Sequence, residues 1–142
     1  MRKIMFLCTG NSCRSQMAEG FAREFGRGLL EVHSAGLLAA RVHPRAVKVV
    51  HEAGVDISGH YSKEIDEELL RQMDIVITLC GNAEAACPAT PSAIIRLHWS
   101  INDPVGMVGS EDEILRAFRT ARDTIKERIE NFISEVKNMN QV

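Results

Sequence analysis

The sequence has little net charge and no long apolar run. Its 142 residues include 17 basic and 19 acidic side chains, which gives a formal net charge of −2. A chain so nearly neutral carries no broad field of one sign, so nucleic acid and anionic membranes are not expected partners. Its apolar stretches fall far short of the ~18 residues that a membrane span requires. The apolar N-terminal segment runs directly into Thr9-Gly10-Asn11 and is too short for a signal peptide. We therefore expect a cytoplasmic protein.

Internal repeats, low-complexity tracts and linkers are also absent from the sequence. Its length lies within the ~100–150 residues at which single domains cluster. Hydrophobic residues make up 45% and charged residues 25% of the chain, a balance that argues against disorder. We therefore expect residues 1–142 to form one domain. No exposed apolar patch is evident in the pattern, so we expect a monomer.

Cysteine is scarce, and its spacing argues against a structural role. The four cysteines are Cys8, Cys13, Cys80 and Cys87. A cytoplasmic chain keeps its thiols reduced, which excludes a disulfide framework. Gaps of four and six residues lack the tight two-residue spacing common in zinc sites, and the five histidines show no metal-ligand spacing either. We expect no metal and no cofactor, so the thiols are either reactive or simply buried.

Short apolar segments alternate with helical patterns along the chain. Strands are expected at residues 3–8, 29–34, 74–79 and 93–99, the first without polar alternation, as in strands buried on both faces. Helices are expected at residues 14–25, 44–54, 63–72 and after a capping-box pair of Ser110 and Glu113. This order predicts a three-layer α/β fold, with a four-stranded parallel sheet and helices on both faces. Functional sites in such folds lie at the carboxyl ends of strands, where Cys8 and Cys80 fall.

The segment from Cys8 to Ser15 is a Cys-x5-Arg sequence between a predicted strand and a predicted helix. Such a loop can point backbone N–H groups inward at the positive end of the helix dipole, where Gly10 permits a backbone conformation that other residues resist. Arg14 adds a planar fork for two oxygens, and the same field favours a Cys8 thiolate, to which Ser15 can donate. The pattern predicts Cys8 as a nucleophile toward a tetrahedral oxyanion bound by Thr9, Gly10, Asn11, Ser12, Cys13, Arg14 and Ser15. The alternative is a buried cysteine with an incidental arginine.

Cys80 ends a predicted strand, and Cys87 follows seven residues later, directly before Pro88. If residues 81–87 are helical, the two Cα atoms lie ~10 Å apart, because a helix rises 1.5 Å per residue. A disulfide requires Cα atoms within roughly 4.4–6.8 Å of each other. A bond between these thiols would therefore unwind the helix. From spacing alone, a core Cys80 and an incidental exposed Cys87 remain the alternative.

Residues 6–20, centred on this loop, resemble the opening of the arsenate reductases built on the low-molecular-weight tyrosine phosphatase fold. The likeness continues through Ser34-Ala35-Gly36, Thr78-Leu79-Cys80-Gly81 and His98-Trp99 to Asp103-Pro104, and so covers nearly the whole chain. The opening is shared in outline with the phosphatases of that fold. The later cysteines distinguish the reductases.

The resemblance implies reduction of arsenate to arsenite, as in arsenic detoxification, with thioredoxin as the reductant. Cys8 would attack arsenate, and Cys80 would attack the adduct, so that arsenite leaves and a Cys8–Cys80 disulfide forms. Cys87 would then attack Cys80 and carry the disulfide to an exposed position for thioredoxin. Asp103 would protonate the leaving oxygen as general acid. Cys13 fits the opening as a small buried side chain without a redox role.

Asn11, Ser15, Glu19 and Ser34 match positions that organise the loop in this family, and three of them (Asn11, Glu19 and Ser34) hold a potassium ion in some members. The fourth ligand in those members is an acidic residue directly after a serine. Here Ser62-Lys63 stands at that place. We hypothesise that the Lys63 ammonium takes the position of the cation.

Two other functions remain open at the level of sequence. A low-molecular-weight protein tyrosine phosphatase would need only Cys8, Arg14 and Asp103, although such phosphatases usually follow Asp-Pro with aromatics, and Val105-Gly106 stands here. Weak phosphatase activity could also accompany reduction, since phosphate and arsenate share shape and charge. A thiol redox sensor would toggle its two later cysteines without turnover.

Overall fold

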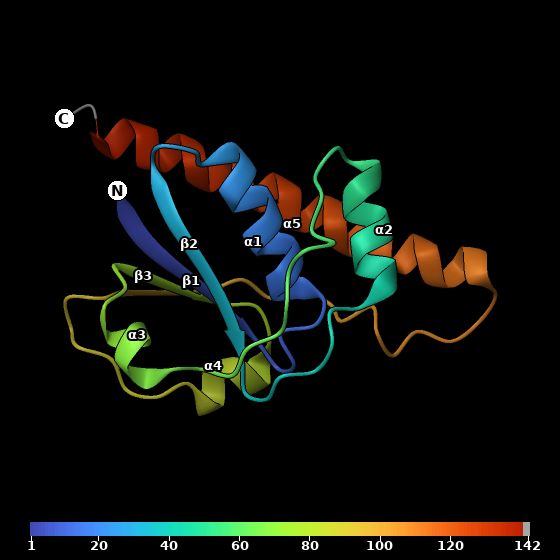
Figure 1. Cartoon of the computed structure of the whole chain (residues 1–142), viewed down its shortest axis with the longest axis horizontal. Coiled ribbons are helices and arrows are strands. Elements are labelled where there is room, and N and C mark those ends of the chain that lie inside the picture. Colours follow the sequence, from blue (N-terminus) through green and yellow to red (C-terminus); the bar gives the residue numbers. More distant parts are fainter. Residues whose placement is uncertain (141–142) are drawn as a thin grey trace.

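Four parallel strands form the central sheet of the computed structural model, which describes residues 1–140 (Figure 1). Their order across the sheet is β2-β1-β3-β4. The strands are β1 (Arg2–Cys8), β2 (Leu30–Gly36), β3 (Ile75–Thr78) and β4 (Ile95–His98). The predicted fold class is confirmed. Residues 141 and 142 of the predicted domain lie outside the described residues.

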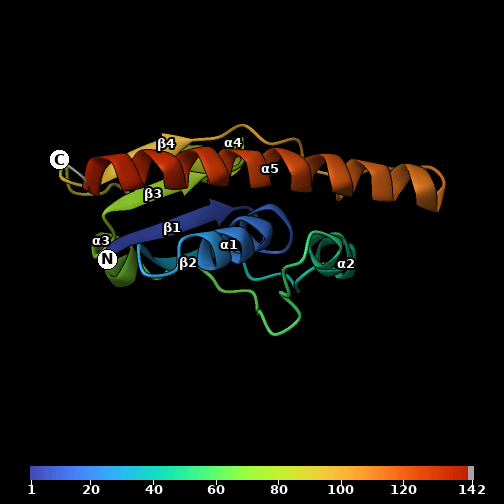
Figure 2. The same cartoon turned by 90° about the horizontal axis from the view of Figure 1, so that it is seen from above.

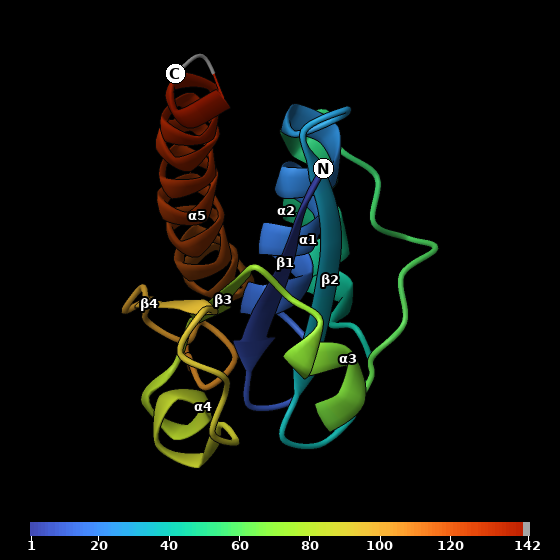
Figure 3. The ribbon, with the colours of Figure 1, turned by 90° about the vertical axis from the view of Figure 1, so that its left-hand side faces the viewer.

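Helices cover both faces of the sheet, as Figures 2 and 3 show. On one face lie α1 (Arg14–Phe25) and α5 (Glu111–Asn140), which pack against each other, and α2 (Pro44–Glu52) packs against both. The short helices α3 (Glu67–Arg71) and α4 (Gly81–Ala86) lie on the opposite side. Within residues 1–140, no helix combines the length and the apolar character needed to cross a membrane.

The two central strands are buried on both faces. Residues 4–8 of β1 and all of β3 are buried, because each strand has a neighbour on either side and helices above and below. The edge strand β4 has one neighbour, and its Ile95 and Leu97 are partly exposed. Burial on both faces removes the need for polar alternation, which accounts for the continuous apolar runs of the sequence.

The long helix α5 begins at the predicted capping box. The backbone N–H of Glu113 donates to Ser110 Oγ (3.2 Å), and the backbone N–H of Ser110 donates to Glu113 Oε1 (3.3 Å). Ion pairs then join α5 to α2: Arg45 binds Glu111, while Arg119 and Arg122 both bind Glu52. These contacts hold α2, and the loop before it, beside the N-terminal end of α1.

The helix predicted at residues 63–72 is wrong in its first half, because α3 contains only Glu67–Arg71. Lys63 and Ile65 instead pair with the end of β2: Gly36 N–H donates to the Lys63 carbonyl (2.8 Å) and Ile65 N–H to the Gly36 carbonyl (3.0 Å). Asp66 then caps α3 by accepting from two backbone N–H groups. Pairing with a distant strand thus overrides local helix preference and carries β2 two residues past its predicted end.

Candidate active site

The loop of residues 9–13 joins β1 to the first turn of α1 and is shaped by the segment that follows β2. Backbone N–H groups of residues 38, 40 and 43 donate to the carbonyls of Thr9, Gly10 and Ser12 at 2.9–3.1 Å. A trans peptide points its C=O and the next residue's N–H in opposite directions. With these carbonyls turned outward, the N–H groups of Gly10, Asn11 and Cys13 face the inside of the loop. Inward N–H groups at the N-terminal end of a helix are the arrangement that a nest for an oxyanion requires.

The left-handed residue of this loop is Asn11, with φ of 47°, and not Gly10. The expectation that Gly10 supplies an unusual backbone conformation is wrong, since it is absent from the residues with positive φ. Gly10 is constrained by contact instead, because a Cβ there would lie 3.1 Å from Ala40 Cβ. Asparagine tolerates the left-handed region better than most residues, so a polar side chain can occupy the turn.

Gly36, at the end of β2, lets the strand approach the loop closely. A Cβ at this position would lie 2.6 Å from the backbone nitrogen of Asn11 and 2.9 Å from the carbonyl carbon of Gly10. Both contacts are shorter than real Cβ atoms show. The loop and the end of β2 therefore fit together only without a side chain here.

Cys8 ends β1 in a buried position and has a hydroxyl partner. Its Sγ lies 2.8 Å from Ser15 Oγ, and Asn11 Nδ2 donates to the same hydroxyl oxygen at 2.8 Å. Because that oxygen already accepts from Asn11, its own proton is available to donate to a Cys8 thiolate. Asn11 is fully buried, and its amide also donates to Ser34 Oγ at 2.9 Å. Ser15 and Ser34, both predicted to organise the loop, are thus both bound by the buried side-chain amide of Asn11.

Arg14 and Asp103 meet at the open side of the loop. Arg14 Nη2 lies 3.3 Å from Asp103 Oδ2, while Nη1 donates to the carbonyls of Ile101 (3.0 Å) and Leu79 (3.4 Å). Arg14 is buried, whereas the Asp103 side chain is half-exposed. These partners orient a buried guanidinium toward the site and keep a carboxylate within reach of a bound oxyanion.

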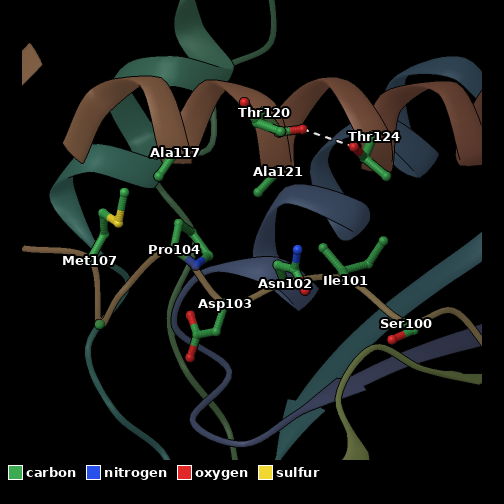
Figure 4. Close-up of a pocket in the computed structure, with 11 residues that line it drawn as sticks. Ser100, Ile101, Asn102, Asp103, Pro104, Met107, Ala117, Thr120, Ala121 and Thr124 are labelled. Atoms are coloured by element: carbon green, nitrogen blue, oxygen red, sulfur yellow. Dashed lines mark hydrogen bonds between the residues drawn. The ribbon is translucent and has the colours of Figure 1, made fainter. Parts of the chain in front are cut away.

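A cavity of about 630 Å³ lies behind Asp103, between residues 100–107 and α5. Ala117, Thr120, Ala121 and Thr124 form its α5 wall. Figure 4 shows the Asp103 carboxylate pointing away from Ala117 and Ala121. No residue of the loop from Cys8 to Ser15 lines this cavity, and the segment carrying Asp103 is incompletely packed on this side.

Cys80 follows β3 at the same edge of the sheet as Cys8, since Leu79 N–H donates to the Leu7 carbonyl (2.8 Å). It is buried and caps α4, with Sγ accepting from Ala83 N–H at 3.3 Å. The hydroxyl of Thr9, the residue after Cys8, lies 3.2 Å from the same sulfur. The second thiol thus lies against the loop of the first.

Cys87 lies at the other end of α4, with its backbone N–H donating to the Ala83 carbonyl (2.9 Å). All four cysteines are free thiols. Partial burial raises the pKa of the Cys87 thiol, and burial raises that of the fully enclosed Cys13 thiol further. With α4 folded, the Cα atoms of Cys80 and Cys87 are separated by a helical span of ~10 Å, too far for a disulfide.

Glu19 is a buried carboxylate surrounded by donors. Ser34 Oγ donates to it, Arg23 Nε donates at 3.0 Å, and Lys63 Nζ lies 3.8 Å away. Lys63 Nζ also donates to the Tyr61 carbonyl at 2.8 Å. Burial lowers the pKa of Lys63, an effect opposed by the Glu19 charge. An ammonium already stands beside this carboxylate, so the residues present do not fit a potassium ion.

Three further residues complete the support of Asn11, and sequence reasoning gave none of them this role. Gln16 Nε2 donates to both the carbonyl and the side-chain oxygen of Asn11 (3.1 and 3.0 Å), and Ser62 Oγ donates to the carbonyl (2.7 Å). His60 Nδ1 lies 3.0 Å from Gln16 Oε1. Gln16 lies within the segment that resembles the family, and Ser62 precedes Lys63 at the matched position. His60 comes from the same distant loop, and no pattern in the sequence indicates its contact. Within residues 1–140, no group of three or more His, Cys, Asp or Glu side chains is arranged to hold a metal ion.

Comparison with known proteins agrees with this geometry. A family model described as low molecular weight phosphotyrosine protein phosphatase matches residues 3–142. The arsenate reductase of Halalkalibacterium halodurans is 50% identical over 129 residues, covering 91% of this chain and 93% of that protein. A solved arsenate reductase in the phosphate binding state is 42% identical, with a TM-score of 0.79 over 96% of this chain and 99% of that one. A thioredoxin-dependent arsenate reductase of Corynebacterium glutamicum is 28% identical, with a TM-score of 0.77 over 98% of this chain and 63% of that one. The chain therefore belongs to the low molecular weight phosphotyrosine protein phosphatase family, and within it is similar to the arsenate reductases.

Proposed function

We propose that this chain is an arsenate reductase that works by a three-thiol relay and is recycled by thioredoxin. The observation that carries the proposal is the 3.2 Å contact between Thr9 Oγ1 and Cys80 Sγ, which sets a second thiol against the loop of the nucleophile. A phosphatase reaction requires one thiol only. The names of the similar proteins support the proposal, since they are arsenate reductases and one is thioredoxin-dependent.

In the first step, arsenate binds in the loop of residues 9–15, and the Cys8 thiolate attacks arsenic. Inward N–H groups and the Arg14 fork neutralise the oxygens, and the Ser15 hydroxyl stabilises the thiolate before attack. A sulfur–arsenic bond forms and an arsenic–oxygen bond breaks. Asp103 protonates the departing oxygen, which leaves as water.

In the second step, the Cys80 thiolate attacks Cys8 Sγ. A sulfur–sulfur bond forms, and the sulfur–arsenic bond breaks with its electron pair remaining on arsenic. The two thiols thereby supply the two electrons that convert As(V) to As(III), and arsenite leaves. Cys80 is favoured as the attacking thiol because its sulfur contacts Thr9, the residue directly after Cys8.

In the third step, Cys87 attacks Cys80 Sγ, and Cys8 leaves as a thiolate. The disulfide now joins Cys80 and Cys87, so α4 must unwind to bring their Cα atoms together. The thioredoxin dithiol then reduces this disulfide by the same kind of exchange. Cys87 is half-buried while α4 is folded, so the same unwinding exposes the bond to its reductant.

Lys63 replaces a potassium ion in this proposal. Its ammonium neutralises the buried Glu19 carboxylate, and its backbone N–H donates to Asn11 Oδ1 at 2.9 Å. The charge and the hydrogen bond therefore come from one residue. The loop is held in its binding conformation without an added cation.

Phosphatase activity is the second candidate, favoured by the geometry of Cys8, Arg14 and Asp103. Phosphate matches arsenate in shape and charge, so the same loop can bind both. Val105, half-exposed after Pro104, offers no aromatic surface for a phosphotyrosine ring. We expect slow hydrolysis of a small aryl phosphate, retained in Cys80→Ser.

The relay is tested by arsenate-dependent NADPH oxidation in the presence of thioredoxin and thioredoxin reductase. Wild type should turn over continuously, whereas Cys87→Ser should stop after roughly one turnover, with a Cys8–Cys80 disulfide accumulating. Ala86→Ser is the matched control, since it alters an exposed neighbour without removing a thiol. If no variant turned over arsenate and all of them hydrolysed an aryl phosphate at the full rate, the protein would be a phosphatase and not a reductase. Continuous turnover of Cys87→Ser would exclude a role for Cys87 in the relay.

A further inference from the structure

The helix between the two later thiols is joined to the sheet by one side-chain hydrogen bond. Glu84, in the middle of α4, accepts a hydrogen bond from Thr78 Oγ1 through Oε2 at 2.6 Å. Thr78 is buried and lies in β3. Ala83 is the only buried residue of α4. A six-residue helix has little stability of its own, so this polar contact is a large share of what keeps it folded on the sheet.

The protons in this contact have one consistent arrangement. Thr78 Oγ1 also lies 2.8 Å from His98 Nδ1, on the neighbouring strand β4. The hydroxyl has one proton, and a carboxylate has none to give, so Thr78 donates to Glu84. His98 Nδ1 must then carry a proton and donate to Thr78. The result is a directed chain from His98 through Thr78 to Glu84, which joins β4, β3 and α4.

This series of hydrogen bonds must break when Cys80 and Cys87 form a disulfide. Cys80 and Cys87 cap opposite ends of α4, and a disulfide between them requires the helix to unwind. Thr78 is fixed in the sheet, whereas Glu84 lies on the segment that moves. We propose that Glu84 is a positioning residue whose contact with Thr78 keeps α4 folded and so opposes formation of the Cys80–Cys87 disulfide. We call this hydrogen bond between Thr78 and Glu84 the latch. The inference rests on the proposed three-thiol relay and adds a residue that controls its last step.

Glu84 acts on Cys87 by charge as well, so the two effects have to be separated. Its carboxylate contributes to the raised pKa of the Cys87 thiol, while Arg96 acts in the opposite direction. Thr78→Val removes the hydroxyl but keeps the Glu84 charge. Agreement between this variant and Glu84→Ala therefore assigns an effect to the latch, since a charge effect would appear only when Glu84 changes.

The test is the thiol–disulfide equilibrium of the full chain in glutathione buffers, in a Cys8→Ser background. One oxidised glutathione takes two electrons from Cys80 and Cys87, giving the intramolecular disulfide and two reduced glutathiones. Burial keeps Cys13 out of exchange. Acid quenching, alkylation and mass spectrometry measure the fraction of Cys80–Cys87 disulfide. Arsenate is not needed, so the latch is tested independently of arsenate chemistry.

Loss of the latch should shift this equilibrium toward the disulfide by roughly three- to tenfold. A tenfold shift corresponds to about 30 mV for the two-electron couple. Glu84→Ala and Thr78→Val should give similar shifts, and the double variant no more than either alone. Glu84→Gln and Thr78→Ser, which retain hydrogen-bonding groups, should shift it less. Alanine is a better helix former than glutamate, so helix propensity alone predicts the opposite direction for Glu84→Ala.

Ala85→Gly separates the latch from helix stability in general. Ala85 is exposed in α4, and glycine weakens the helix without touching Thr78. Its effect should add to that of Glu84→Ala. A Cys80–Cys87 disulfide that forms equally in the Cys8→Ser parent and after the added Glu84→Ala or Thr78→Val change overturns the latch and leaves the relay standing. Failure of the Cys8→Ser parent to form that disulfide at any glutathione potential overturns the relay and the latch together.

Discussion

The hydroxyl oxygen of Thr9 lies 3.2 Å from the sulfur of Cys80, although 71 residues separate them in the chain. The contact arises because β1 and β3 are neighbours in the sheet and end at the same edge. In the proposed relay, it joins the residue after the nucleophile Cys8 to the thiol that attacks second. A hydroxyl at this place can donate to a thiolate and so prepare Cys80 for attack.

Removing this hydroxyl should slow the second step of the reaction. In Thr9→Val, the Cys80 thiolate loses a donor, and we expect Cys8–Cys80 disulfide formation to slow by roughly tenfold, as for a hydrogen bond to a charged group. The measurement is a single turnover with arsenate, quenched by acid and followed by alkylation of free thiols. Thr9→Ser restores the hydroxyl and should recover most of the rate. A Thr9→Val rate equal to that of wild type would show that the contact has no kinetic role.

Replacing Asn11 should destabilise the whole chain. Its buried side chain serves Ser15, Ser34, Gln16 and the Lys63 backbone, so Asn11→Ala leaves several polar groups without partners. We expect the free energy of unfolding to fall by about 3 kcal/mol and phosphate binding to weaken. Asn11→Gly loses the same contacts but adopts a φ of 47° without strain. It should therefore be about 1 kcal/mol more stable than Asn11→Ala in urea unfolding. Equal stability of the two variants would argue against backbone strain at this position.

Turnover should not depend on the choice between potassium and sodium. The Lys63 ammonium stands 3.8 Å from Glu19 Oε1, where an added cation would be repelled. Lys63→Asp removes that charge and adds a carboxylate, so we expect this variant to bind potassium and to gain a several-fold response to it. Steady-state rates in matched potassium and sodium salts provide the measurement. A several-fold increase for wild type in potassium would contradict the substitution of lysine for the ion.

Stability should depend on pH through the contact between α2 and α5. Hydrogen bonds from Arg119 and then Arg122 lower the pKa of Glu52 from its ordinary 4.5 to about 2. A carboxylate whose folded-state pKa is lowered stabilises the fold above its unfolded pKa. This contribution is therefore complete above about pH 5 and is lost as the pH falls toward 2.

The matching measurement compares the melting temperature of wild type with that of Glu52→Gln between pH 6 and pH 2. Wild type should melt higher at pH 6, and the difference should close as the pH falls. Glu24→Gln is the control, because Glu24 forms only an exposed pair with Arg27 within one turn. It should change the melting temperature little at any pH. A Glu52→Gln difference that stays constant down to pH 2 would contradict the ion pairs.

Features encoded within a short stretch of sequence could be predicted. The Cys8 loop, the start of α1 at Arg14 and the capping box of Ser110 each depend on residues a few positions apart. The sheet also followed from local apolar runs, because strands buried on both faces need no distant partner to be recognised. The resemblance to a family then located Asp103, Glu19, Ser34 and Lys63.

Features that depend on distant segments meeting could not be predicted. The extended backbone of residues 63–65 results from pairing with Gly36, which no local preference indicates. Gln16 and His60 join the loop network only because a segment far along the chain returns to it. The contact between Thr78 and Glu84 needs both the position of α4 and the rotamer of one glutamate. Such contacts become visible only in three dimensions.

In the proposed relay, the sheet holds two of the three thiols, and the third lies beyond a six-residue helix. Cys8 ends β1 and Cys80 follows the neighbouring strand β3, so the pairing of these strands fixes where the two backbones lie relative to each other. Only the segment from Gly81 to Cys87 has to rearrange, and β3 remains as a template on which it can refold. If the relay operates as proposed, each catalytic cycle includes the unfolding and refolding of α4. The rate at which this helix reforms would then set an upper limit on the turnover rate.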